Sequence, residues 1–392
     1  MSRSPSALKE IFVYFFRLGL TGFGGPLALI SAMQKDLVET RRWMTLDEFS
    51  RAFALIKAMP GPIAFQMAVF LGRHRAGFAG ATVAAVMLNL PAFIAMIFLG
   101  AFEETFVASP AIRTLLSGMQ AAALGLILAS TKGLFWNFRA RGRFWSIFAI
   151  GLAVVYTWPS FEPLFIVAAG LISVVLAKKF VAPKIAFIPL VGLSRFPWFT
   201  HEGASTAVIV AGSWWGAFGP LVWNCFKAGA FVFGSGIAIV PLMENDFVTN
   251  LRWLTHEEFM NALAFGQITP GPVVITATYI GFKSLGLVGA FAATIAIFLA
   301  PFFHMTTWFP HAMSRLSRQT WIDDFILGAI AVVTAAVLTS VVSLATGSSF
   351  SWIHYVVLAL SFIAVLLAKA PAWVVIPGGG LVVLLAGIAK IF

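Results

Sequence analysis

The segment AMPGPIAF, residues 58–65, places two prolines and a glycine inside an apolar stretch, and ITPGPVVI repeats the arrangement at residues 268–275. Proline lacks a backbone donor and clashes with the preceding turn, so an uninterrupted helix cannot pass through Pro60. Pro62 suits the first turn of a new helix, and Gly61 permits the bend between the two. The two triplets therefore predict two broken helices, each with free amides where its second part begins.

The composition of the chain is that of a membrane protein. Of its 392 residues, 60% are hydrophobic and 10% are charged. Too few polar side chains remain to cover a soluble globule. The net charge of +11 comes from Lys and Arg in short loops between apolar runs, which indicates membrane orientation and not nucleic-acid binding. The single cysteine, Cys225, cannot form an internal disulfide.

Apolar runs of about 20 residues predict membrane-crossing helices. The first run, 11–33, is too long for the apolar core of a cleavable signal, so we expect a retained anchor. Further spans are expected at 77–100, 111–130, 144–158, 161–177, 226–243, 285–303, 322–345, 352–368 and 372–390. The runs 49–72 and 259–281 contain the triplets, and 204–224 is either an additional span or the lead-in to the next one.

The two halves of the chain carry the same motifs in the same order, 210 residues apart. Of the 54 positions from 17 to 70, 17 hold the same residue as the position 210 further on. The identities include Gly19, Phe23, Gly24, Asp36, Arg42, Trp43, Thr45, Glu48, Phe49 and the triplet 60–62. This agreement indicates an internal duplication, because shared hydrophobicity does not preserve polar positions.

Loop charges predict that the two halves have opposite orientations. Residues 34–75 carry seven Lys and Arg, whereas the equivalent loop of the second half keeps only Arg252 and Lys283. One loop later the asymmetry reverses, with Glu103 and Glu104 in the first half and two arginines in the second. Because cytoplasmic loops collect basic residues, equivalent loops are expected on opposite sides of the membrane.

The sequence thus predicts an all-α polytopic membrane protein whose homologous halves form inverted-topology repeats. We expect about ten transmembrane helices plus two re-entrant segments at the Pro-Gly-Pro triplets. If the triplet segments cross instead, the alternative is 12 or 13 spans. The domains are a first transporter repeat at 1–177, a basic cytoplasmic connector at 178–204 and a second repeat at 205–392.

Two helix N-termini that open inside the membrane suit an anionic ligand, because free amides donate hydrogen bonds and carry partial positive charge. Glycine runs at 21–26 and 231–236 precede the charged loops, and serve either helix packing or an unwound anion-binding turn. The candidate substrate-binding residues are Gly24, Gly25, Lys57, Pro60, Gly61, Pro62, Gln66, Gly234, Ser235, Gly236, Gln267, Thr269, Pro270, Gly271 and Pro272.

Three cations lie near these motifs. Lys57 is a candidate to add positive charge to the site, and its alternative is a lysine whose stem packs while the ammonium reaches the interface. Arg17 and Lys227 occupy equivalent places before the glycine runs. Cations inside a membrane are candidates for coupling or gating, and the alternative is that these two mark helix ends at the interface.

Four further residues are candidates for coupling or gating. Arg42 and Arg252 each precede a tryptophan, and we favour interfacial anchors over gate contacts for both. Glu48 and Glu258 are the repeated carboxylates nearest the broken helices, where burial would favour proton binding. A threonine three residues before each glutamate has the spacing of a capping box, which is the reading that we favour.

A membrane enzyme is the rival class, and its motifs are incomplete. His256, Glu257 and Glu258 begin like a zinc-protease motif, but Met260 follows and no second histidine completes it. No G-x-x-x-x-G-K-[ST] phosphate loop is present, so an ion gradient or counter-ion exchange is expected to supply the energy. We therefore expect no catalytic residue, no metal and no cofactor.

The motifs resemble those of the chromate transporter family in its long, two-domain form. They are R-x-G-x-x-x-F-G-G-P from Arg17, R-R-W-x-x-x-x-E-F from Arg41 and M-P-G-P from Met59, followed by F-G-S-G and T-P-G-P in the second copy. The resemblance covers roughly residues 10 to 390. Ser235 stands where such proteins often have glycine, and Lys57 where many have an uncharged polar residue.

This resemblance implies a bacterial inner-membrane protein that exports chromate and confers chromate resistance. Sulfate is implied as a related or competing oxyanion, and a passive oxyanion channel is the alternative. The expected partners are the oxyanion and the lipid bilayer, without nucleic acid, and a homodimer is compatible with the sequence.

Overall fold

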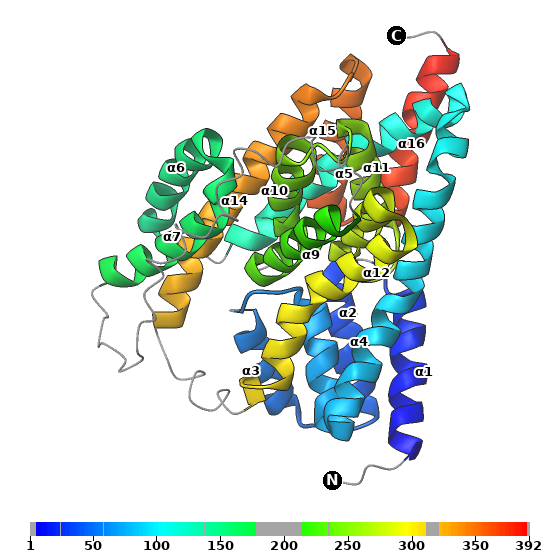
Figure 1. Ribbon diagram of the computed structural model, residues 1–392. Coiled ribbons are helices and arrows are strands. Elements are labelled where there is room, and N and C mark those ends of the chain that lie inside the picture. Colours follow the sequence, from blue (N-terminus) through cyan, green and yellow to red (C-terminus); the bar gives the residue numbers. More distant parts are fainter. Residues whose placement is uncertain are drawn as a thin grey trace.

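The computed structural model describes residues 5–23, 25–57, 59–136, 138–177, 214–233, 236–310 and 321–389, which are helical without a strand ladder (Figure 1). The first half contains α1 (Pro5–Thr21), α2 (Gly25–Met33), η1 (Gln34–Thr40), α3 (Leu46–Ile56), α4 (Ile63–Val107), α5 (Pro110–Phe135), α6 (Gly142–Thr157), η2 (Pro159–Phe161) and α7 (Glu162–Leu176). The second contains α9 (Trp214–Phe231), η4 (Gly236–Ala238), α10 (Ile239–Met243), η5 (Glu244–Asn250), α11 (His256–Ile268), η6 (Val273–Ile275), α12 (Thr276–Thr306), α14 (Trp321–Gly347), α15 (Trp352–Ala368) and α16 (Ala372–Ile388).

The helices confirm a polytopic membrane protein. Among the described residues, α4, α5, α14 and the segments Pro159–Leu176 and Val273–Thr306 are long and apolar enough to cross a bilayer. The shorter apolar helices α6, α15 and α16 match three further predicted runs. Of the run 204–224, the part from residue 214 leads into α9, and the connector 178–204 lies outside the described residues.

The first apolar run is not one continuous anchor, which corrects the expectation for 11–33. α1 ends at Thr21, and α2 starts at Gly25, whose φ of +79° is outside the helical range. A Cβ on Gly22 would lie 2.3 Å from Leu29, so the chain packs closely on itself at this break. The equivalent run 226–243 is also interrupted, between α9 and the short α10.

α4 folds back on itself near its start. Ala76 and Gly77 leave the helical conformation, and Gly77 has a φ of +65°. Residues eight apart in a continuous helix are separated by about 12 Å along the axis, yet a Cβ on Gly72 would lie 2.3 Å from the carbonyl oxygen of Gly80. The segment is therefore an antiparallel pair of arms, an inner arm 63–75 and an outer arm 78–107.

α12 repeats this hairpin in the second half. Leu285 and Gly286 break the helix, and a Cβ on Gly281 would lie 2.3 Å from the carbonyl oxygen of Gly289. The inner arm is 276–284 and the outer arm is 287–306. The same glycine spacing thus produces the same reversal in both copies.

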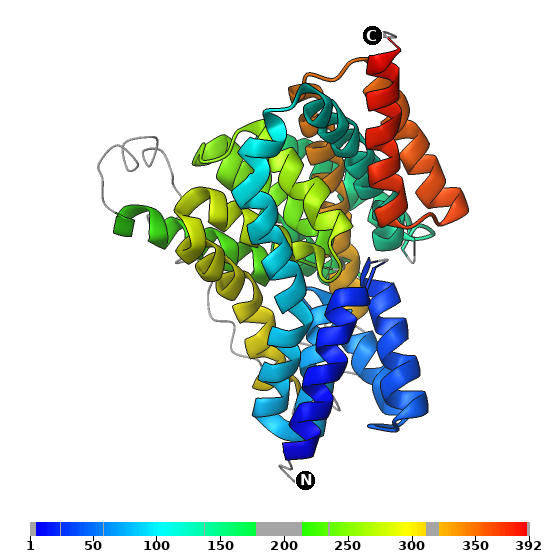
Figure 2. The ribbon, with the colours of Figure 1, turned by 90° about the vertical axis from the view of Figure 1, so that its right-hand side faces the viewer.

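In the first half, the start of α1, the segment between η1 and α3 and the end of the inner arm of α4 lie together. We call this place the first base. Glu10 on α1 accepts hydrogen bonds from Arg41 at 3.1 Å and Trp43 at 3.2 Å, just before α3, and from Arg75 at 3.0 Å, at the end of the inner arm. The chain therefore leaves this base through α1 and α3, and returns to it through η1 and the inner arm. Figure 2 shows α1 rising from the N-terminus beside the blue segment that follows it.

The corresponding base of the second half lies at the opposite end of α4. Lys283, at the end of the inner arm of α12, pairs with Glu258 on α11 at 2.9 Å and with Glu103 at 3.0 Å. Glu103 lies near the last turn of the outer arm of α4, about 38 Å along the helix from residue 78. Arg73, near the first base, in turn donates to the carbonyl oxygen of Thr306 at the end of α12.

The two halves exchange their last helices. α15 and α16 pack against α5 of the first half, while α6 and α7 pack against α14 of the second half (Figure 1). α4 also packs against α12, and α5 against α14. α14 is the most enclosed of the long apolar helices, so the core of the molecule is built jointly by both copies.

Candidate functional site

The reversals of the broken segments produce four tips that meet where the halves join. The four tips are residues 22–25, 59–62, 232–236 and 269–272, of which Gly24, Gly234 and Ser235 lie outside the described residues. Backbone contacts connect the tips across the halves, including an isolated bridge between Pro60 and Phe233.

Each triplet is held by the first tip of the other half. The amide of Gly61 donates to the carbonyl oxygen of Val232 at 2.6 Å, and the amide of Gly271 donates to that of Gly22 at 3.3 Å. The donors Gly61 and Gly271 are 210 residues apart, and so are the acceptors Gly22 and Val232. These two amides are therefore occupied, although the sequence suggested them as free donors to an anion.

Both triplet glycines adopt backbone conformations that L-residues avoid. The φ of Gly61 is +126° and that of Gly271 is +116°. A Cβ on Gly61 would lie 2.6 Å from Nε2 of Gln66 and 2.8 Å from Pro301. Around Gly271 the nearest atom is the Cβ of Ala92 at 3.5 Å, so the first triplet is packed more tightly than the second.

A buried amide side chain lies at the first triplet. α4 starts at Ile63 after Pro62, and the helix leaves its first amides without intrahelical acceptors. Gln66 is fully buried and donates from Nε2 to the carbonyl oxygen of Pro60 at 2.7 Å. Among the described residues, nothing hydrogen-bonds to its Oε1. Because Oε1 is an acceptor, it favours water or another hydrogen-bond donor beside it.

The second triplet also has a buried glutamine beside it, which precedes the triplet in the chain instead of following it. Gln267 is 8% exposed, and its Nε2 has no hydrogen-bond partner within the described ranges. Gly236, in the neighbouring tip, lies so close to the start of η6 that a Cβ there would be 3.8 Å from the amide of Val274. Thr269 instead donates within its own helix, to the carbonyl oxygen of Gly266 at 3.3 Å.

The candidate cations differ in their surroundings. Lys57 is exposed, with its ammonium 5.5 Å from the ring centre of Phe53, and Arg17 is exposed as well. Lys227 is largely enclosed and pairs with Asp246 at 2.8 Å. Of the three, the structure therefore buries only Lys227 with a counter-charge.

Arg42 and Arg252 share an unusual backbone. Both are exposed, with φ of +53° and +54°, where glycine or asparagine is usual. Arg42 lines a cavity of about 430 Å³ together with Glu48 and His74, at the base of the first half. The structure thus brings together two of the residues that the sequence suggested for gating.

Glu48 and Glu258 both form capping boxes. Thr45 donates from its backbone amide to Glu48 at 2.9 Å, while its hydroxyl accepts from the amide of Glu48 at 3.2 Å. Thr255 and Glu258 form the same pair of bonds. The hydrogen bonds from Thr45 hold the pKa of the Glu48 carboxyl below its usual value.

Sequence reasoning missed a buried polar network between the halves. Asn261 on α11 donates to Glu103 at 2.7 Å and accepts from Gln120 on α5 at 2.8 Å. Glu103 falls in the predicted loop between the runs 77–100 and 111–130, but it lies within α4 and only 3% of it is exposed. Gln120 and Asn261 are polar residues within the apolar runs 111–130 and 259–281, and they were the sequence signal that could have predicted this network.

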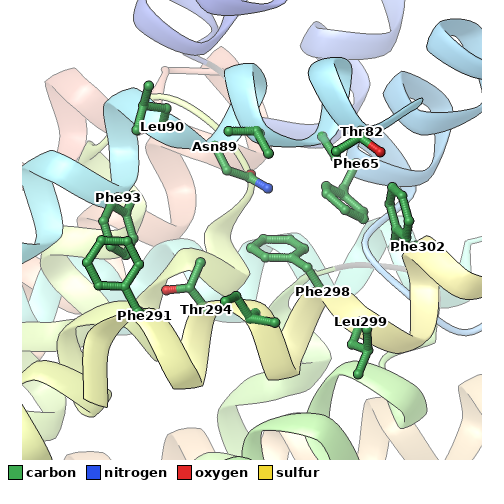
Figure 3. Close-up of a pocket in the computed structure, with 13 residues that line it drawn as sticks. Phe65, Thr82, Asn89, Leu90, Phe93, Phe291, Thr294, Phe298, Leu299 and Phe302 are labelled. Atoms are coloured by element: carbon green, nitrogen blue, oxygen red, sulfur yellow. The ribbon is translucent and has the colours of Figure 1, made fainter. Parts of the chain in front are cut away.

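An apolar cavity of about 370 Å³ lies between the outer arms of α4 and α12 (Figure 3). The wall includes four phenylalanines from the outer arms and Phe65 from the start of α4. Its polar residues are Thr82, Asn89 and Thr294, which offer few donors to a doubly charged anion. This cavity therefore fits an oxyanion less well than the tips do.

The chain matches the family described as Chromate transporter twice, over residues 9–175 and again over 219–385. The two matches are 210 residues apart, the same offset that relates the motifs and the tips. No solved structure matches the chain.

Curated relatives cover most of the chain. It is 32% identical over 351 residues to a probable chromate transport protein of Synechococcus elongatus, covering 86% of this chain and 84% of that protein. It is 33% identical over 394 residues to a chromate transport protein of Cupriavidus metallidurans, covering 97% and 93%, and 27% identical to one of Pseudomonas aeruginosa, covering 87% and 82%. The resemblance seen in the motifs is therefore confirmed, and the chain belongs to the chromate transporter family.

Proposed function

We propose that this chain is a secondary active transporter that exports chromate across a bacterial inner membrane and thereby confers chromate resistance. The names of its relatives support chromate as the substrate. Sulfate, another tetrahedral dianion, is proposed as an exchanging or competing ion. Transporters that bind at the junction of two repeats commonly use helix ends in this way.

The observation that carries the proposal is the reciprocal pairing of the tips. Gly61 bonds to Val232 and Gly271 to Gly22, so each triplet contacts the described part of the first tip of the other half. Gln267 brings a buried donor, Nε2, to this region, whereas the donor of Gln66 is occupied by Pro60 and its unpaired atom is the acceptor Oε1. Among the described residues, 59–66, 236 and 267–274 are the proposed oxyanion site, which uses neutral donors and can therefore release its ligand.

We also propose that the two halves are inverted in the membrane and that their broken segments re-enter. The first base contains Glu10, and the second contains Lys283, at opposite ends of the outer arm of α4. Such an arrangement places equivalent loops on opposite sides, as their charges suggest.

Chromate export is tested in a chromate-sensitive bacterium that expresses the chain at verified membrane levels. Expression should lower accumulated chromate and raise the tolerated concentration. Gly61→Leu and Gly271→Leu should abolish both effects while the protein still inserts, because each side chain would enter a tip. Unchanged chromate accumulation with abundant wild-type protein would remove chromate as the substrate.

Carrier and channel are separated in proteoliposomes. A carrier should accumulate chromate against its gradient when a proton or sulfate gradient is imposed, whereas a channel only equilibrates it. Trans-side sulfate that accelerates chromate flux would support exchange. Flux that never proceeds uphill under either gradient would favour the passive channel.

A further inference from the structure

A second group of charged side chains is enclosed between α7, α9, η5 and α14. Lys227 on α9 pairs with Asp246 on η5. Glu244, at the start of η5, accepts hydrogen bonds from two serine hydroxyls of α14, one at 2.7 Å. Glu162, the first residue of α7, lies close enough to interact electrostatically with all three.

Glu162 is the member of this group with the poorest compensation. It is 1% exposed, and within the described part of the chain no group hydrogen-bonds to its Oε1. A glutamate in the first turn of a helix is ordinarily stabilised by the helix dipole. Such glutamates are ordinarily exposed to water, whereas Glu162 is buried. Burial that leaves this carboxylate oxygen without a hydrogen-bond donor disfavours the ionised form.

The charge balance points to the same residue. Among the described side chains, three carboxylates lie around one ammonium, so full ionisation would leave two of their negative charges without a described cation in a buried region. Asp246 is matched by Lys227 and Glu244 by its hydroxyl donors, whereas no described group donates a hydrogen bond to Oε1 of Glu162. A proton on Glu162 removes one of the two excess charges.

The other titratable groups near α7 do not replace this proton. Cys225 on α9 is a buried thiol that also faces the ion pair. Asp324 on α14 pairs with Arg141 and Arg143. It lies toward the other end of α7, because Gly328 packs against Ala169 and Ser173 there.

We propose that Glu162 is the proton-binding carboxyl of this transporter, held beside the Lys227–Asp246 ion pair. The connection to the anion site is short, because Lys227 precedes by five residues the Val232 carbonyl that holds Gly61. A shift of Val232 that α9 follows would change the distance between Lys227 and Glu162. An approaching ammonium favours release of the proton as H⁺, and a retreating one favours its uptake.

The coupling role rests on the proposed transport function, and proteoliposomes with labelled chromate test it. A gradient of about one pH unit should sustain up to about tenfold chromate accumulation per coupled proton. Glu162→Gln should lose this response, whereas Glu162→Asp, which still titrates, should keep part of it. Glu104→Gln, which alters an exposed glutamate of α4, is the matched control and should respond like the wild type.

Infrared titration tests the proton itself without requiring transport. Purified wild-type protein should show a protonated-carboxyl C=O band at neutral pH that Glu162→Gln removes and Glu104→Gln keeps. If the wild type carries no chromate while this band behaves as expected, the transport function fails and the proton site stands. A pH response and a band that both survive in Glu162→Gln would overturn the proposal, as would a sodium gradient replacing the pH gradient in the wild type.

Discussion

Gly61 is the most constrained residue of the candidate site. Its φ is positive, and a Cβ would approach both Gln66 and Pro301 to within 3 Å. Gly271 has a similar φ but more open surroundings. Equivalent positions in the two copies therefore tolerate a methyl group to different extents.

We predict that Gly61→Ala destabilises the protein more than Gly271→Ala. Both pay about 1–2 kcal/mol for the unfavourable φ, and Gly61→Ala adds about 1–3 kcal/mol of overpacking. Thermal unfolding in detergent measures the difference. Gly133→Ala is the control, since its Cβ would meet nothing within 4 Å. Equal losses at the two triplet glycines would contradict the packing asymmetry.

The capping boxes give a second prediction at this scale. Thr45→Ala should destabilise the protein by about 0.5–2 kcal/mol, because the first turn of α3 loses its side-chain bonds. The folded-state pKa of Glu48 is lowered, so its contribution is present above the ordinary carboxyl pKa and is lost as pH falls through the lowered value. The loss of stability caused by Thr45→Ala should therefore be smaller below about pH 4 than at neutral pH. Unfolding midpoints of the wild type and the variant, compared at neutral pH and below about pH 4, measure this difference. A loss of stability that does not change with pH would contradict a stabilising role of the Glu48 carboxylate in the capping box.

At the scale of elements, Lys283 connects three of them. Its ammonium pairs with Glu103 on α4 and with Glu258 on α11, while Lys283 itself belongs to α12. Asn261 completes the bonds to Glu103. The base of the second half is thereby fixed to the first half by charge-assisted bonds in a largely buried place.

We predict that Lys283→Met destabilises the protein by about 3–5 kcal/mol, because Glu103 would remain buried without its cation. Adding Glu103→Gln should recover part of the loss in thermal unfolding. Arg51→Met removes one partner of the exposed Asp47–Arg51 pair and should cost less than about 0.5 kcal/mol. A double variant no more stable than Lys283→Met would show that burial of Glu103 is not the cause.

The sequence predicted those features that depend on interactions between residues close together in the chain. The breaks at the triplets, the capping boxes and most helices depend on neighbours in the chain, and the patterns indicated them correctly. The reversals at Gly77 and Gly286 depend on packing between helical arms, and hydropathy does not report it. For the same reason, the reciprocal bonds of Gly61 and Gly271, and the burial of Glu162, became visible only in three dimensions.

At the scale of the whole molecule, neither half contains its own complete core. α6 and α7 pack on α14, and α15 and α16 pack on α5. The two sequence repeats thus share one packed core. The predicted boundary between 177 and 178 separates sequence repeats, but not independently packed bodies.

We predict that the fragments 1–177 and 178–392 are unstable when expressed separately and assemble when expressed together. Each alone would expose the helix faces that normally contact the other half. Co-purification and size-exclusion profiles measure assembly, and the chromate resistance of the host reports recovered function. A monodisperse fragment 1–177 with the thermal stability of the intact chain would contradict this dependence.

The acceptors that hold the two triplets are main-chain oxygens of Gly22 and Val232. A residue's carbonyl survives every amino-acid replacement, so mutation at these two positions cannot delete the acceptor. Only proline at 61 or 271 would remove a donor. Val232 can therefore be replaced while its contact to Gly61 is kept, whereas Gly22 is restricted by its packing against Leu29 and not by the hydrogen bond that it accepts.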